Sequence, residues 1–145
     1  MRYKIFLIDD DEDDRDLFED AISELPFQTE IDTFANGLDL FEYLGAGHPI
    51  PHLIFMDFNM PVLNGADCLL RIRSEKRLLD IPVIVYSTII VDSIAKRLSE
   101  SGANQYLQKP SSFQQLKSML ELCITNVLNI NGKGQGKLEF VFREM

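Results

Sequence analysis

Short polar groups follow four apolar runs of this sequence, and their side chains are of the types that phosphoryl chemistry uses. Asp9 and Asp10 follow the run IFLI, and Asp57 follows LIFM. Ser87 follows IPVIVY, and Lys109 follows QYLQ. If the four runs are parallel strands, these side chains meet at one edge of a single sheet.

Three carboxylates at one edge would repel one another and raise one another's pKa values, so a cation must neutralise them. The single positive charge of Lys109 cannot balance three negative charges. A divalent cation can, and ligation by oxygen atoms alone favours Mg²⁺ or a similarly hard ion such as Mn²⁺. Mg²⁺ typically binds one or two carboxylates together with phosphate oxygens. The cluster therefore predicts a Mg²⁺ site for phosphoryl chemistry, with Ser87 and Lys109 as donors to the remaining phosphoryl oxygens.

The segments between the apolar runs have the spacing of amphipathic helices. In the first segment, apolar residues recur at helical intervals: Leu17, Phe18, Ala21, Ile22 and Leu25. The run LIFM is apolar on both faces, which is typical of a strand that helices cover on both sides. Five strand–helix units with right-handed crossovers predict an α/β fold, a doubly wound five-stranded parallel sheet with helices on both faces. Ligands bind such sheets at the carboxyl ends of the strands, where the polar groups lie.

Short polar side chains mark the expected helix starts. Asn64 and Asp92 are expected to cap the third and fourth helices, because their side-chain oxygens can accept hydrogen bonds from free backbone N–H groups. The acidic residues from Asp11 to Asp14 occupy the first turn of the first helix, where the helix dipole favours negative charge. We interpret them as a solvated helix start rather than as further metal ligands.

The length of 145 residues and the apolar content of 46% fit one domain with a substantial core, which we place at residues 1–130. Residues 131–145 comprise a glycine-rich linker, NGKGQG, and a short strand-like extension, KLEFVFREM. In this extension Leu138, Phe140 and Phe142 share one face. Because an isolated strand is not stable in water, the extension must pair with its own sheet, pair with a partner chain or remain disordered.

Composition argues against two classes of partner. The formal net charge of -9 disfavours nucleic acid, because binding to phosphates needs clustered Lys and Arg side chains. No apolar stretch approaches the roughly 20 residues of a membrane span, and the start of the sequence lacks the long apolar segment of a signal peptide. We expect a cytoplasmic protein that binds neither nucleic acid nor a membrane.

From about Lys4 to Ile130 the chain closely resembles the receiver domain of two-component response regulators. The matching motifs are LIDDD, LIFMDFNMPVLNG, PVIVYST and QYLQKP, in this order and at suitable spacings. The resemblance implies the flavodoxin-like receiver fold. The acidic first helix, DDDEDDRDLFEDAI, resembles that of stand-alone receivers more than that of receivers joined to DNA-binding domains.

The resemblance also implies roles for the acidic residues and the lysine. Asp57 becomes the phosphoacceptor and a metal ligand. Asp9 and Asp10 become the acidic pair that holds Mg²⁺, Asp10 directly and Asp9 largely through water. The main-chain carbonyl of Asn59 becomes a further metal ligand, and Lys109 becomes the ammonium that binds the phosphoryl group.

The same resemblance implies a switch. Ser87 takes the position of the hydroxyl that binds the phosphoryl group, and Tyr106 takes the position of the switch aromatic. Pro61 and Gly65 match the turn after the phosphoacceptor strand. The positions two residues beyond Asp57 and Ser87 flank the path of the hydrolytic water in this family, and the second of them is Ile89.

The function implied by the resemblance is that of a phosphoacceptor signalling protein, which assists its own phosphorylation and dephosphorylation but is not otherwise an enzyme. Its expected donor is a sensor histidine kinase or a histidine phosphotransfer protein, and its output goes to a downstream protein partner. A homodimer would form through the face of the fourth helix, fifth strand and fifth helix, or through the C-terminal extension.

Two other functions remain open from the residues. One is a Mg²⁺-dependent phosphatase or phosphotransferase with an Asp nucleophile, similar to haloacid dehalogenase-like enzymes. Those usually carry a second Asp two residues after the nucleophile, where this chain has Asn59, and this chain also lacks an obvious cap segment. The other is a pseudo-receiver adaptor that is never phosphorylated, which is disfavoured because no site residue is missing.

Overall fold

Helices and strands alternate along the chain, of which the computed structural model describes residues 2–60, 63–130 and 140–142. The strands are β1 (Arg2–Ile8), β2 (Gln28–Phe34), β3 (Leu53–Asp57), β4 (Val83–Ser87), β5 (Gln105–Gln108) and β6 (Val141–Phe142). The helices are α1 (Glu12–Ser23), α2 (Gly37–Gly45), α3 (Gly65–Ser74), α4 (Asp92–Glu100) and α5 (Phe113–Val127), with a 3-10 turn at Lys76–Leu78. The strands form one sheet in the order β2-β1-β3-β4-β5-β6, and every neighbouring pair is parallel.

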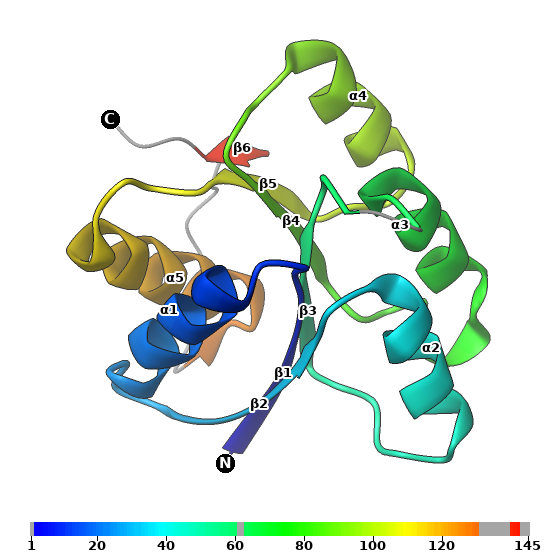
Figure 1. The fold of residues 1–145 in the computed structure, drawn as a ribbon, viewed down its shortest axis with the longest axis horizontal. Coiled ribbons are helices and arrows are strands. Elements are labelled where there is room, and N and C mark those ends of the chain that lie inside the picture. Colours follow the sequence, from blue (N-terminus) through cyan, green and yellow to red (C-terminus); the bar gives the residue numbers. More distant parts are fainter. Residues whose placement is uncertain (1, 61–62, 131–139, 143–145) are drawn as a thin grey trace.

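The sheet is the middle layer of an α/β sandwich. Helices α1 and α5 cover one face, and α2, α3 and α4 cover the other (Figure 1). Alternate residues of β1 divide between the two layers: Ile5 and Leu7 pack with α1 and α5, whereas Phe6 and Ile8 pack with the other helices. Because each central strand is buried on both faces, its sequence is a continuous apolar run. The predicted doubly wound parallel sheet is therefore confirmed.

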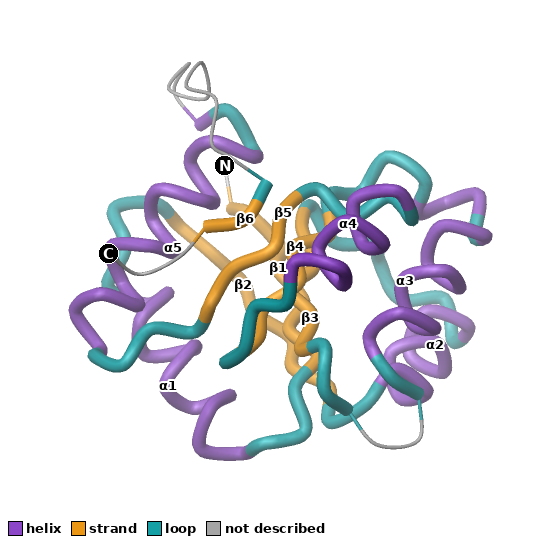
Figure 2. Tube along the Cα trace, turned by 90° about the horizontal axis from the view of Figure 1, so that it is seen from above, coloured by secondary structure: helices purple, strands orange, loops and turns teal. Residues whose placement is uncertain are grey.

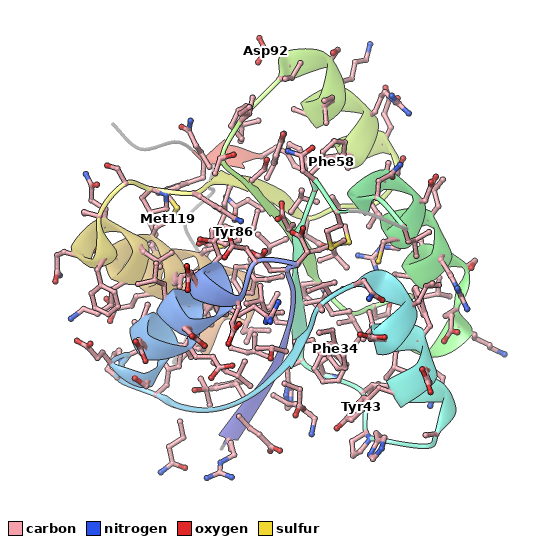
Figure 3. The ribbon with its side chains drawn as sticks, viewed as in Figure 1. Phe34, Tyr43, Phe58, Tyr86, Asp92 and Met119 are labelled. Atoms are coloured by element: carbon pink, nitrogen blue, oxygen red, sulfur yellow. The ribbon has the colours of Figure 1, made fainter. Side chains whose placement is uncertain are left out.

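Aromatic side chains occupy both layers. Phe34 at the end of β2 contacts Tyr43 of α2, with ring centroids 5.2 Å apart in an edge-to-face arrangement (Figure 3). On the opposite face, Tyr86 and Met119 belong to the apolar cluster under α1 and α5. The Lys109 Nζ atom lies 4.9 Å from the centroid of the Tyr86 ring. Tyr86 therefore connects this apolar layer to the polar groups at the carboxyl edge of the sheet.

The sheet has one strand more than the five that we predicted, because the C-terminal extension adds β6 to the outer edge of β5. The register pairs Tyr106 with Val141 and Leu107 with Phe142. The Tyr106 N–H donates a 2.8 Å hydrogen bond to the Phe140 carbonyl oxygen. Of the three expected arrangements of the extension, pairing with the chain's own sheet is the one observed (Figure 2). The linker at 131–136 and Leu138 lie outside the described residues.

Side chains of the extension cover both sides of the β5 edge. Phe140 and Val141 pack against the apolar cluster under α2, α3 and α4, and Phe142 packs against the cluster under α1 and α5. Removing residues 131–145 should therefore uncover apolar surface and an unpaired strand edge, which templates pairing with another chain. We expect the melting temperature to fall by roughly 2–5 °C and the sedimentation coefficient to rise with concentration.

A full-length Val141→Asp variant tests whether β6 itself is responsible, because it places a charge on this partly buried edge without shortening the chain. Val141→Asp should lower the melting temperature as removal of residues 131–145 does. Unchanged melting and sedimentation in both variants would mean that the extension contributes little to the fold.

One local prediction is wrong. Asp92 is the first residue of α4, and the N-cap is Val91, whose side chain offers no capping oxygen. Asp92 still lies in the first turn, where its charge is favourable to the helix dipole. Leu17 is 46% exposed, because the buried stripe of α1 runs along Phe18, Ala21 and Ile22 and Leu17 lies at its border. The predicted cap at Asn64 is confirmed, since its side chain accepts a hydrogen bond from the Asp67 N–H.

No helix within the described ranges is both long enough and apolar enough to cross a membrane.

Candidate functional site

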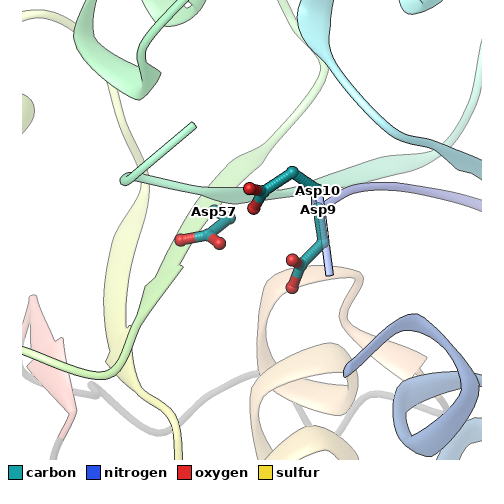
Figure 4. A group of neighbouring side chains, drawn as sticks. All are labelled: Asp9, Asp10 and Asp57. Atoms are coloured by element: carbon teal, nitrogen blue, oxygen red, sulfur yellow. The ribbon is translucent and has the colours of Figure 1, made fainter. Parts of the chain in front are cut away.

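Three carboxylates gather at the carboxyl ends of the two central strands β1 and β3 (Figure 4). Because Ile8 pairs with Met56 in the sheet, the next residue of each segment, Asp9 and Asp57, lies beside the other. Oxygen atoms of Asp9, Asp10 and Asp57 lie within 4.8 Å of one another. Asp9 and Asp57 are buried, whereas Asp10 is exposed. This set of hard oxygen donors, open to solvent on one side, fits a Mg²⁺ ion that keeps several waters.

The Asp57 carboxylate is largely buried, with its side chain 9% exposed. Its Oδ1 accepts a hydrogen bond from the Asn59 N–H at 3.2 Å, and its Oδ2 lies 3.4 Å from Lys109 Nζ. Burial raises the pKa of Asp57 to about 6; the Lys109 charge opposes this increase, and the negative charge of Asp9 adds to it. At neutral pH the group is therefore an ionised carboxylate, which can act as a nucleophile.

Lys109 bridges the acidic residues. Its Nζ lies 3.0 Å from Asp9 Oδ2 and 2.9 Å from Asp14 Oδ2, in addition to its contact with Asp57. Burial alone would lower the pKa of Lys109, but hydrogen bonds to Asp14 and Asp9 and the charges of Asp9 and Asp57 outweigh it and raise the pKa. Lys109 therefore carries its positive charge throughout the neutral range.

The backbone fixes Lys109 beside Ser87, since its N–H donates a 2.7 Å hydrogen bond to the Ser87 carbonyl oxygen. The Ser87 side chain is buried at the end of β4, and its Oγ lies 3.4 Å from the Ile89 N. The Tyr106 hydroxyl donates a 2.8 Å hydrogen bond to the Ile89 carbonyl oxygen. Burial raises the pKa of Tyr106, and hydrogen bonds with the Val91 backbone and the Ser87 side chain oppose this increase. The Tyr106 ring is thus held inward, next to Ser87.

A close turn follows β3. The Gly65 N–H donates a 2.9 Å hydrogen bond to the Phe58 carbonyl oxygen. A Cβ at Gly65 would lie 2.7 Å from the Phe58 Cα, so only glycine fits this approach. Asn59 lies in this turn with its side chain exposed. Pro61, which we also expected in the turn, lies outside the described residues.

The predicted site residues Asp9, Asp10, Asp57 and Lys109 thus meet in space, and Ser87 ends the neighbouring strand. Asp14 was missed, because the acidic start of α1 looked like a uniformly solvated turn. The four-residue spacing from Asp14 to the buried Phe18 places Asp14 on the inner side of the helix. That spacing was the signal for its contact with Lys109. The N-cap itself is Asp11, which accepts hydrogen bonds from the Asp13 and Asp14 N–H groups.

The raised pKa of Asp57 predicts a pH-dependent cost to the metal-free fold. Because the folded state holds the proton more tightly than the unfolded chain, the free energy of unfolding falls as pH rises from about 4 to about 6 and stays lower above that. In EDTA at about pH 7.5, Asp57→Asn should therefore raise the melting temperature by roughly 3–6 °C. The difference should disappear as the pH is lowered below about 4.

Added Mg²⁺ should raise the melting temperature of the wild-type chain. Millimolar Mg²⁺ is expected to stabilise the wild-type chain and to have a much smaller effect on Asp10→Ala, because a ligand that binds only the folded state raises its stability. The exposed residue Asp20 supplies a control, and Asp20→Asn should melt like the wild type in both conditions. The absence of any Mg²⁺-dependent shift in the wild type would contradict a metal site here.

Residues 5–121 match the family model for the response regulator receiver domain. The chain is 30% identical to the chemotaxis protein CheY1 of Helicobacter pylori over 121 residues, covering 83% of this chain and 96% of that protein.

Two solved structures share the fold. A crystal structure of the phosphorylated cyanobacterial phytochrome response regulator RcpA aligns with a TM-score of 0.81 at 28% identity, covering 88% of this chain and 95% of that one. The Mn²⁺-bound form of the response regulator Rcp1 aligns with a TM-score of 0.77 at 23% identity, covering 94% of this chain and 99% of that one.

Proposed function

This chain belongs to the response regulator receiver domain family, and on that premise we propose that it is a switch operated by phosphorylation of Asp57. Its established class is that of a signalling protein of two-component systems. We assign the phosphoacceptor function to residues 1–130. The observation that carries the assignment is a buried Asp57 carboxylate with Lys109 Nζ 3.4 Å away and two further carboxylates beside it.

In the proposed reaction, a carboxylate oxygen of Asp57 attacks the phosphorus of a phosphohistidine in line. An oxygen–phosphorus bond forms, the phosphorus–nitrogen bond breaks, and its electron pair leaves with the donor imidazole, which takes up a proton. Lys109 neutralises negative charge on the transferring group. Asp9, Asp10, Asp57 and the main-chain carbonyl of Asn59 would hold Mg²⁺, which supplies further neutralisation of the phosphoryl oxygens when bound.

The donor must reach Asp57 from solvent, and a groove of 330 Å³ opens beside Lys109. Tyr86, Thr88, Pro110 and Phe113 are among the residues that line it. A sensor histidine kinase or a histidine phosphotransfer protein is the donor that this chemistry implies. The groove lies between α1 and the start of α5, so these elements would contact the donor.

Phosphorylation would be passed on through Ser87 and Tyr106. New phosphoryl oxygens attract the Ser87 hydroxyl, and Tyr106 already hydrogen-bonds the β4–α4 loop through the Ile89 carbonyl. A change at Ser87 therefore alters the packing of Tyr106 and of the face formed by α4, β5 and α5. This is a two-state population shift biased by a covalent ligand. We propose that this face, bordered by β6, binds the downstream protein partner or a second copy of the chain.

The test is incubation of the purified chain with Mg²⁺ and acetyl phosphate, followed by intact mass and peptide mapping. One phosphoryl group on Asp57 is the expected result. Continuous release of phosphate from simple phosphomonoesters, without a stable adduct, would instead support a phosphatase. No adduct and no turnover would leave a pseudo-receiver adaptor as the function.

A further inference from the structure

We propose that Asp14 is a positioning residue that competes with the phosphoryl group for Lys109. The inference rests on the proposed function and adds to it a residue outside the acidic pair and the phosphoacceptor. In the unphosphorylated protein Asp14 holds the ammonium group. When Asp57 carries a phosphoryl group, Asp14 releases the Lys109 ammonium group.

The contacts of Lys109 leave no hydrogen free for a new partner. An ammonium group has three N–H donors. Three carboxylate oxygens lie around Nζ, those of Asp14 at 2.9 Å, Asp9 at 3.0 Å and Asp57 at 3.4 Å. A phosphoryl oxygen on Asp57 can gain a direct hydrogen bond from Lys109 only if one of these contacts is given up.

Of the two carboxylates that phosphorylation leaves unmodified, Asp9 and Asp14, Asp14 is the better able to leave. The Asp9 side chain is fully buried, and its Oδ1 also accepts the Asp11 N–H at 3.0 Å. The Asp14 side chain is 34% exposed, and it lies at the edge of the groove of 330 Å³ beside Lys109. Water can therefore solvate the Asp14 carboxylate when the ammonium moves away, whereas Asp9 would lose its partner inside the protein.

The backbone at Asp14 does not have to move during this exchange. The Asp14 N–H is held by Asp11 Oδ1 at 3.2 Å in the capped first turn of α1. Only side-chain torsions need change, and the cap survives replacement of the Asp14 side chain. Asp14→Asn removes the negative charge and keeps the size of the side chain, and we expect it to fold like the wild type because the cap uses the backbone N–H of Asp14 and not its side chain.

The experiment measures the affinity of beryllofluoride, a phosphoryl mimic, in saturating Mg²⁺ by isothermal titration calorimetry. Asp14→Asn should bind it roughly fivefold more tightly than the matched control Asp13→Asn, which is the change expected from losing one partly exposed ion pair. Asp13 is an exposed neighbour in the same turn, so its replacement removes the same charge. Asp14→Glu restores a carboxylate and should return the affinity toward that of the wild type.

A second titration, with Mg²⁺ alone, separates this role from a general charge effect. If Asp14 acts through Lys109, the two Asn variants change Mg²⁺ affinity alike and differ only for beryllofluoride. Equal beryllofluoride affinities in the two variants would overturn the proposal, as would weaker binding by Asp14→Asn. Failure of the wild type to bind beryllofluoride or accept a phosphoryl group would instead overturn the proposed function, and this inference with it.

Discussion

Replacing Asp57 by Asn should abolish the phosphoryl adduct that the wild-type chain gains from acetyl phosphate and Mg²⁺. The amide is close in size to the carboxylate but has no nucleophilic oxygen anion, so the oxygen–phosphorus bond cannot form. Asp9 and Asp10 are poor substitutes, because Asp9 is already held by Lys109 and the Asp11 N–H, and Asp10 is exposed. Intact mass spectrometry at matched times measures the labelled fraction.

The control for this experiment is Asp20→Asn, which removes an exposed carboxylate of α1 and should be labelled like the wild type. Both proteins should have matching far-ultraviolet circular dichroism, so that loss of labelling is not loss of fold. Equal labelling of Asp57→Asn and the wild type would show that the phosphoacceptor is another residue.

The second large effect concerns the lifetime of the phosphorylated protein. Ile89 lies in the loop after β4, two residues beyond Ser87, and the residue is 62% exposed. An isoleucine side chain has no donor or acceptor to orient a hydrolytic water, and positioning contributes strongly to such a step. We therefore expect a phospho-Asp57 lifetime of many minutes or longer. Ile89→Glu should shorten it roughly tenfold if about 1.4 kcal/mol of the barrier is involved.

Phosphate release from the purified phosphoprotein in excess Mg²⁺ measures this lifetime. Val91→Glu is the matched control, because Val91 is a partly exposed apolar residue of the same loop, 40% exposed, and its replacement adds the same charge farther from Ser87. The lifetime of this variant should stay within about twofold of the wild type. A wild-type half-life of seconds, or no acceleration in Ile89→Glu, would mean that Ile89 does not govern access of water.

The sequence by itself determined the sheet and the place of the site. Apolar runs such as LIFM have no polar residue on either face, so a strand formed by such a run must be buried on both sides. Two helical layers provide that burial, which predicts a parallel sheet. Parallel strands then bring the residues after each run to the same edge, which is why the sequence alone predicts that Asp9, Asp57 and Lys109 lie together. The cap at Asn64 was equally local, because a helix start needs an oxygen within three residues.

Only the tertiary structure decided which of these groups touch. Lys109 meets Asp14 across 95 residues of sequence, and the helical spacing of Asp14 defines a face but not the charge that this face meets. The distances from Lys109 Nζ to its three carboxylate partners differ by only a few tenths of an ångström, and these partners lie on separate elements. The inward position of Tyr106 is likewise set by a carbonyl oxygen 17 residues away.

The same distinction explains the C-terminal strand. The alternation of Phe140 and Phe142 predicted a strand, but its partner depends on which sheet edge remains free once the rest of the chain has folded. Without β6 the sheet has two edge strands, β2 and β5, and β6 pairs with β5, whose Tyr106 N–H donates to the Phe140 carbonyl oxygen. Local sequence determines what a segment can form, because backbone torsions and periodicity are local properties. Its partner is decided by packing, because the free energy of pairing depends on surfaces that distant segments create.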